Sequence, residues 1–125
     1  MITIEEKDSD TIQLNLQGDV TADDYKNIRP ALENIFKKTG PKKFLFNMKS
    51  DVKFTLGAMI QDIKFDPQHF KFIGTTAVVS TKGMAGIVTK MADVFYPVKM
   101  EQFEDVPSAY HWLKKHQVGT PGNPA

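Results

Sequence analysis

Residues 80–86, Ser-Thr-Lys-Gly-Met-Ala-Gly, have the composition of a phosphate-binding loop. They follow an apolar run and lead into a helical pattern. The backbone amides at the start of a helix bind anions, and Lys82 is available here to assist. A dinucleotide loop needs glycines for the tight turn and for close approach of the pyrophosphate, whereas this stretch has two glycines three apart. A Walker loop needs Gly-Lys-Ser/Thr, which this stretch lacks. The stretch therefore indicates a strand-to-helix turn that can accept an anion, and we expect no bound cofactor.

Histidines are the next candidates for chemistry, and the sequence contains three of them. His111 and His116 are five residues apart on a predicted helix, so they do not share a face as an i, i+4 pair of metal ligands would. Both lie near lysines in the last turn, where a histidine suits the helix dipole. His69 follows Pro67 near the end of another predicted helix, where a cap or turn role is favoured over catalysis. We expect neither a metal site nor a catalytic histidine.

The acidic residues and the absence of cysteine also argue against an enzyme. Without cysteine the chain has no disulfide, no catalytic thiol and no thiolate metal site. Asp23 and Asp24 suit the start of a helix. Glu101 and Glu104 suit an exposed strand edge, and Asp105 suits a helix cap. Paired acids do acid–base chemistry where burial separates their pKa values, and nothing in the sequence indicates such burial. We therefore expect a protein without enzymatic activity.

The helical pattern after the glycine-containing turn has a wide apolar side. Apolar residues cover about half of the helix circumference at about 100° per residue, whereas packing on a sheet needs a stripe of ~100°. These apolar residues are Met84, Ala85, Ile87, Val88, Met91, Ala92, Val94 and Phe95. The surplus either contacts neighbouring helices or lines an apolar pocket or partner surface, and the sequence leaves both interpretations open.

Our hypothesis is that this helix lines a pocket at the carboxyl edge of the sheet, where open α/β folds bind their ligands. The pocket-lining residues in this hypothesis are Met84, Ile87, Val88 and Met91. Ser80, Thr81 and Lys82 would lie at the pocket mouth, available to a polar head group. The expected ligand is small and apolar or lipid-like. An exposed patch in place of a pocket would favour a protein partner or a homodimer.

Length and composition restrict the class of protein. A chain of 125 residues is one domain by length, and its apolar fraction of 41% and charged fraction of 25% are ordinary for a soluble globular domain. Lys and Arg, at 16, nearly balance Asp and Glu, at 15, so the net charge of +1 does not favour nucleic acid as a partner. No apolar stretch approaches the ~18 residues of a membrane span, and the acidic N-terminal segment is unlike a signal peptide. We expect a cytoplasmic protein.

The first forty residues predict two strands and a helix. Apolar and polar residues alternate over residues 2–4 and again over residues 12–16, on either side of a polar turn. A helix then begins after Thr21, a good cap that forms a capping-box pattern with Asp24, and it stops at Gly40-Pro41. Its inner stripe consists of Tyr25, Ile28, Leu32, Ile35 and Phe36.

The remaining sequence alternates strands with helices. Residues 43–48 and 75–80 are apolar runs typical of buried strands, and residues 98–103 form a last strand. Helical spacing between the first two of these strands occurs at Leu56, Met59, Ile60 and Ile63. Asp105 and Pro107 open a final helix. The order ββαβαβαβα predicts one α/β domain with a mixed, mostly parallel sheet flanked by helices.

The predicted domain spans residues 1–117, and residues 118–125, rich in Gly and Pro, form a predicted flexible tail. The residues expected to matter for folding only are Leu14, Leu32, Phe46, Val78, Val79 and Leu113.

Three stretches resemble the SpoIIAA-like family of the STAS superfamily. They are LQGDVTADDYKNIRPALENI at the first helix, HFKFIGTTAVVS at the strand before the glycine-containing turn, and VKMEQFEDVPSAYHWL at the last strand and helix. Each motif consists mostly of packing residues, so the resemblance is carried by their order over nearly the whole chain, from Met1 to about Gln117. It implies a small mixed sheet flanked by helices, in a fold related to the CRAL-TRIO lipid carriers.

The chain departs from one pattern of that superfamily. Anti-sigma-factor antagonists carry a phosphorylatable serine in an Asp-Ser-Ser-Gly-Leu turn after the third strand, whereas this chain has MKSDVKFTLGAM there. Ser50 precedes Asp51 in reversed order, and no Gly-Leu follows directly. Phosphorylation of Ser50 would add nearly two negative charges near a predicted helix start, so a switch is physically feasible. The favoured interpretation is an ordinary serine in a polar turn.

These observations predict a non-enzymatic binding module of the SpoIIAA-like type. It holds a small apolar or lipid-like ligand or docks onto a protein partner. The alternative is a phospho-switched regulatory protein that resembles the anti-sigma-factor antagonists, with Ser50 as the switch.

Overall fold

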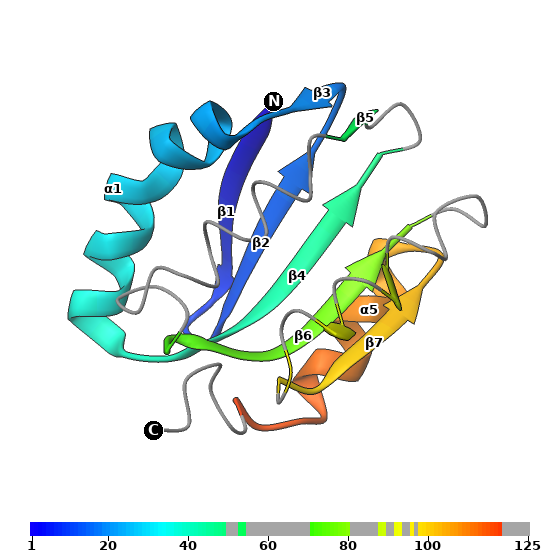
Figure 1. Cartoon of the computed structure of the whole chain (residues 1–125). Helices are drawn as coiled ribbons and strands as arrows, with labels where there is room; N and C mark the ends of the chain where they lie inside the picture. Colours follow the sequence, from blue (N-terminus) through cyan, green and yellow to red (C-terminus); the bar gives the residue numbers. More distant parts are fainter. Residues whose placement is uncertain are drawn as a thin grey trace.

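A computed structural model describes residues 1–49, 53–54, 71–80, 88–89, 92–93, 96 and 98–118 of the chain. Its helices and strands are, in chain order, β1 (Ile2–Asp8), β2 (Thr11–Leu16), β3 (Asp19–Val20), α1 (Ala22–Thr39), β4 (Lys42–Met48), β5 (Lys53–Phe54), β6 (Ile73–Val79), β7 (Met100–Phe103) and α5 (Val106–Lys114). Figure 1 shows them arranged around a central twisted sheet. Residues 88–89 and 92–93 are helical, as their spacing predicts, and the helix expected around residues 56–63 lies outside the described residues.

The central sheet has five strands in the order β1-β2-β4-β6-β7. β1 and β2 are antiparallel because a short hairpin joins them, and Ile4 lies opposite Leu14 in their register. The pairs β2–β4, β4–β6 and β6–β7 are parallel, so the chain must leave the sheet between them. The predicted mixed, mostly parallel sheet is confirmed.

A second, two-stranded sheet pairs β3 with β5 in parallel, with Asp19 opposite Lys53 and Val20 opposite Phe54. The sequence does not predict it, because two residues are too few to show an alternating pattern. Val20 is nevertheless fully buried, so this small sheet extends the core on the side of α1.

α1 begins and ends where its sequence predicts. The Thr21 side chain accepts a hydrogen bond from the Asp24 amide, and the Asp24 carboxylate accepts one from the Thr21 amide at 2.9 Å, which completes the capping box. Gly40 follows the helix with φ of 75°, a left-handed conformation that glycine adopts without steric cost. These local contacts satisfy backbone groups that a helix terminus otherwise leaves unbonded.

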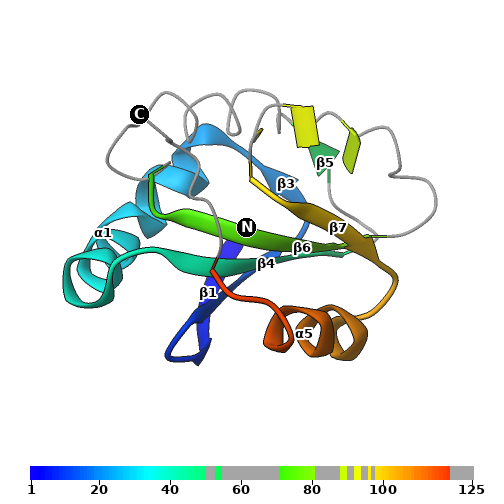
Figure 2. The same cartoon turned by 90° about the horizontal axis from the view of Figure 1, so that it is seen from below.

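α1 and α5 cover opposite faces of the sheet (Figure 2). Successive strand residues point to opposite faces, so Phe44 and Phe46 pack in the core under α1, whereas Leu45 packs in the core under α5. The predicted core residues are all buried, namely Leu14, Leu32, Phe46, Val78, Val79 and Leu113. Each face therefore has its own apolar core, separated by the sheet.

A buried lysine joins the sheet to the end of α5. Lys43 is 6% exposed, and its Nζ donates hydrogen bonds to the carbonyl oxygens of Leu113, at 2.8 Å, and His116, at 3.2 Å. The last carbonyls of a helix lack intrahelical partners and carry a partial negative charge. Lys43 therefore acts as a C-terminal cap supplied by a strand.

The end of the described chain docks against the start of β6. The Val118 carbonyl accepts hydrogen bonds from the Thr75 amide, at 2.6 Å, and the Thr75 hydroxyl, at 3.0 Å. Gly74 makes this approach possible, because a Cβ at residue 74 would lie 2.4 Å from the Val118 oxygen. Val118 is thus anchored although the sequence places it in the tail. Residues 119–125 lie outside the described residues.

Candidate functional site

Ser80 and Val88 are the predicted ligand-binding residues that the structure describes. Ser80 is buried at the end of β6, where its hydroxyl accepts a hydrogen bond from the Gln102 side chain at 2.8 Å. Its amide donates to the carbonyl of Phe103 at 3.0 Å. Val88 is half-buried and packs against the core on the α1 face. Ser80 therefore joins β6 to β7, and Val88 contacts the protein core.

The other predicted ligand-binding residues lie outside the described residues, namely Thr81, Lys82, Met84, Ile87 and Met91. The pocket along that helix stays a prediction. Ser50 also lies outside the described residues, so the phospho-switched alternative stays a prediction too.

The two histidines of the described chain have a packing role or an exposed position. His116 Nδ1 lies 2.8 Å from the carbonyl oxygen of Trp112, one turn earlier, and the two rings pack with centroids 4.4 Å apart. His111 is exposed on α5, and His69 lies outside the described residues. Among the residues that the structure describes, no three His, Asp or Glu side chains gather as a metal site requires.

Asp8 and Tyr110 connect the β1–β2 hairpin to α5. The Tyr110 hydroxyl donates a hydrogen bond to Asp8 Oδ2 at 2.5 Å. Burial raises the pKa of Asp8, but hydrogen bonds from Tyr110 and the Asp10 amide outweigh burial, so the pKa lies below its ordinary value. The same hydrogen bond to Asp8 raises the pKa of Tyr110 above its ordinary value. The phenol therefore stays protonated, which suits a structural contact better than proton transfer near neutral pH.

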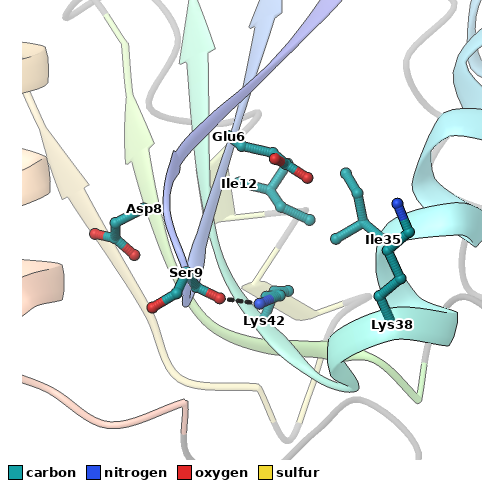
Figure 3. Close-up of a pocket in the computed structure, with 7 residues that line it drawn as sticks. All are labelled: Glu6, Asp8, Ser9, Ile12, Ile35, Lys38 and Lys42. Atoms are coloured by element: carbon teal, nitrogen blue, oxygen red, sulfur yellow. Dashed lines mark hydrogen bonds between the residues drawn. The ribbon is translucent and has the colours of Figure 1, made fainter.

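A small pocket of about 100 Å³ lies between the hairpin and the last turns of α1 (Figure 3). Its lining residues are Glu6, Asp8, Ser9, Ile12, Ile35, Lys38 and Lys42. Lys42 is 4% exposed and donates from Nζ to the Ser9 carbonyl. In Figure 3 the Glu6 carboxylate points toward α1, whereas Asp8 points away from the pocket.

The charges of this pocket balance one another. Lys38 and Lys42 oppose Glu6, the nearby carboxyl end of α1 adds partial negative charge, and the Asp8 carboxylate points away. The volume corresponds to about three water molecules at ~30 Å³ each. We interpret the pocket as the packing site of the buried Lys42 side chain rather than as a ligand site.

A larger cleft of about 220 Å³ lies on the opposite side of the last turns of α1. It is lined by Glu33, Phe36, Lys37, Lys71 and Phe72. At 100° per residue, the three α1 residues of this group face away from the two that line the smaller pocket. The cleft therefore opens between α1 and the segment that enters β6, two parts of the chain that run close together in Figure 1.

The wall of the cleft is aromatic. The Phe36 and Phe72 rings are stacked, with centroids 4.9 Å apart and an angle of 16° between their planes. Phe36 also packs on Phe44 at 6.1 Å, and Phe44 packs on Phe46 at 6.0 Å. Phe36 is buried, whereas Phe72 is half-buried. A row of four rings thus leads from the core to the cleft, and Phe72 is its accessible end.

Two lysines form a positive rim. Lys71 Nζ lies 5.3 Å from the centroid of the Phe72 ring, and Lys37 is exposed on the facing helix. Glu33 is engaged by Arg29, with Nε and Oε1 3.5 Å apart. Within the described residues, no carboxylate lies within 4.0 Å of the Lys37 or Lys71 ammonium. The arrangement can hold an apolar group against the rings and a negative group at the rim.

Sequence reasoning missed this cleft. Phe36 belongs to the predicted inner stripe of the first helix, and Phe72 to the stretch HFKFIGTTAVVS that carries the resemblance. The available signal was Phe-Lys-Phe immediately before a buried strand, which places a charge between two aromatic residues. That signal does not predict which other helix or strand the Phe72 ring would pack against.

Within the described residues, no helix is long and apolar enough to cross a membrane. Comparison with curated proteins finds no match. A similar solved structure is that of an uncharacterized protein from Shewanella loihica PV-4, of the DUF3478 family and with a SpoIIAA-like fold. It is 24% identical, with 90% of this chain and 92% of that chain covered and a TM-score of 0.65, a likeness that shows the fold. The profile of the family described as SpoIIAA-like matches residues 11–114. The chain therefore belongs to the SpoIIAA-like family.

Proposed function

We propose that the protein is a non-enzymatic binding module that holds a small apolar ligand in the cleft between α1 and the start of β6. The observation that carries this proposal is the stacked pair of Phe36 and Phe72 in a cleft of about 220 Å³. The described lining residues supply aromatic faces and charged groups but no hydroxyl, thiol or imidazole. Such a lining suits binding better than nucleophilic or histidine-based acid–base chemistry.

The size of the cleft limits the ligand. An apolar cavity of ~150 Å³ binds benzene, and pockets for drug-sized molecules start at ~300 Å³. At about 220 Å³ the cleft lies between these values, so the ligand is a molecule of one ring or a short chain. Covering the half-buried Phe72 ring would contribute about 25 cal/mol for each Å² of apolar surface removed from water.

Toluene is a suitable probe, because its single ring fits within the cleft and it has no polar group. We expect a dissociation constant on the order of 1 mM, about −4 kcal/mol, which NMR titration of the ¹⁵N-labelled protein can measure. The shifted amides should be those of residues 33–37 and 71–72. Native mass spectrometry of freshly purified protein would show whether a natural ligand accompanies the chain.

Two phenylalanine substitutions separate the cleft from the rest of the surface. Phe72→Ala removes the accessible ring and should abolish toluene binding. Phe103→Ala is the matched control, because Phe103 is also half-buried but packs on Trp112 on the α5 face, with centroids 5.5 Å apart. Thermal melts of both variants show whether each still folds. The proposal would be contradicted if toluene shifted amides outside the cleft, or if both variants lost toluene affinity equally.

A protein partner and a homodimer stay predictions. Among the described residues, the large apolar side chains that are exposed are Met1 and Tyr96. Single exposed apolar residues are ordinary on protein surfaces and do not by themselves mark an interface.

A further inference from the structure

We infer that the cleft selects a small aromatic carboxylate, one ring bearing one carboxylate group. This inference rests on the proposed function and names the ligand class for the same cleft. A long-chain lipid is excluded, because it would not fit wholly within the cleft. Size, ring stacking and charge each contribute to it.

The volume fits one ring and one small polar group. Benzene occupies a cavity of ~150 Å³, so a ring leaves about 70 Å³ of the 220 Å³ cleft. That remainder is close to two water volumes of ~30 Å³ each, which suits a carboxylate. A second ring or a long acyl chain would have to extend into solvent and would lose the contacts that bind it.

The aromatic wall favours a flat ligand over a flexible chain. Phe36 and Phe72 are nearly parallel, with an interplanar angle of 16°, and Phe36 continues through Phe44 to Phe46 in the core. The Phe72 ring, at the accessible end of this row, is thus backed by packed rings that lead into the core. A planar ligand that stacks on Phe72 would add one more ring and lose little conformational entropy.

The charges favour an anion over a neutral ring. Lys71 Nζ lies 5.3 Å from the centroid of the Phe72 ring, close to where the ligand ring would bind. Lys37 lies on the facing helix, and neither ammonium has a carboxylate within 4.0 Å in the described part of the chain. Glu33 also lines the cleft, where its carboxylate pairs with Arg29, and the nearby carboxyl end of α1 adds partial negative charge. The attraction for an anion therefore comes from the Lys37 and Lys71 ammonium groups. Exposed pairs of this kind contribute modestly and weaken with salt.

The experiment compares three probes by NMR titration at pH 7 and low ionic strength. Benzoate has the ring and the charge, benzyl alcohol has the ring without the charge, and hexanoate has the charge without the ring. Benzoate is ionised at this pH, because carboxyl groups of its kind titrate near pH ~4. We expect benzoate to bind about 3- to 10-fold more tightly than either other probe, and the advantage over benzyl alcohol to shrink as salt rises.

Lysine substitutions test the two charges separately. Lys71→Met and Lys37→Met should each weaken benzoate about 2- to 5-fold and leave benzyl alcohol unchanged. Lys99→Met is the matched control, because Lys99 Nζ also lies over an aromatic ring, 5.8 Å from the Trp112 centroid. This control should bind all three probes as the parent does.

The outcomes distinguish this inference from the proposed function. Equal binding of benzoate and benzyl alcohol would overturn the charge selectivity and leave the apolar cleft intact. Hexanoate that binds as tightly as benzoate would overturn the aromatic selectivity and again leave the cleft intact. If no probe shifts the amides around Phe36 and Phe72, the inference and the proposed function both fail.

Discussion

Replacing Lys43 with methionine tests how the sheet holds the end of α5. The Lys43 Nζ donates to the carbonyl oxygens of Leu113 at 2.8 Å and His116 at 3.2 Å, and the side chain is buried. Methionine keeps most of the length and apolar volume, so the substitution removes the ammonium with little change in packing. The two carbonyls then lose the ammonium donor, and the Leu113 oxygen keeps the hydrogen bond from the His116 amide.

The expected effect follows from three contributions. Hydrogen bonds to a charged group contribute about 1.5–3 kcal/mol each, and a cation at a helix carboxyl end adds about 0.3–1 kcal/mol. Burying an ammonium costs several kcal/mol, and the variant no longer bears that cost. We therefore expect the free energy of unfolding to fall by about 2 kcal/mol, with a decrease in Tm of roughly 5–10 °C for a domain of this size.

Thermal and urea denaturation followed by far-UV circular dichroism would measure this difference. Lys115→Met is the matched control, because Lys115 is exposed at the end of the same helix and should change the stability by less than about 0.5 kcal/mol. Hydrogen exchange should accelerate more in α5 than in α1 of the Lys43 variant. A Lys43→Met protein that melts with the parent would show that these two hydrogen bonds do not stabilise the fold.

Three further substitutions test burial, close packing and pH dependence. Val78→Asp places a carboxylate in a fully buried strand position and should lower stability by several kcal/mol, so a Tm within a few degrees of the parent would contradict the assigned burial. Gly74→Ala places a Cβ 2.4 Å from the Val118 oxygen and should lower the free energy of unfolding by about 1–3 kcal/mol, as measured by urea denaturation. An unchanged stability would show that Val118 is not held against β6. Tyr110→Phe removes the hydrogen bond that lowers the pKa of Asp8 in the folded state. A carboxyl group whose pKa is lowered by folding stabilises the folded state at pH values above its pKa in the unfolded chain, about 3.9. This contribution is lost as the pH falls through the pKa in the folded state. The stability difference between parent and Tyr110→Phe should therefore shrink as the pH is lowered from 7 to 3, and a constant difference would refute the assignment.

Local patterns in the sequence were sufficient to predict the main elements. The capping box of Thr21 and Asp24 and the stop at Gly40 involve residues within a few positions of one another, and the structure confirms them. The buried strands β4 and β6 were predictable because each contains a run of consecutive apolar residues, 44–46 and 77–79, which places apolar side chains on both faces. The ordered motifs that resemble the SpoIIAA-like family predicted the fold, which the family profile and the solved structure confirm.

Tertiary structure decided which side chains those elements bring together. Lys43 is buried because the end of α5, 70 residues later in the chain, supplies its carbonyl partners. Phe36 and Phe72 form the aromatic wall only because the end of α1 packs beside the entry to β6. Periodicity shows which face of an element is apolar, but it does not show which other element covers that face. The ring stack, the buried ammonium and the cleft all depend on distant partners, so they became visible only in the folded chain.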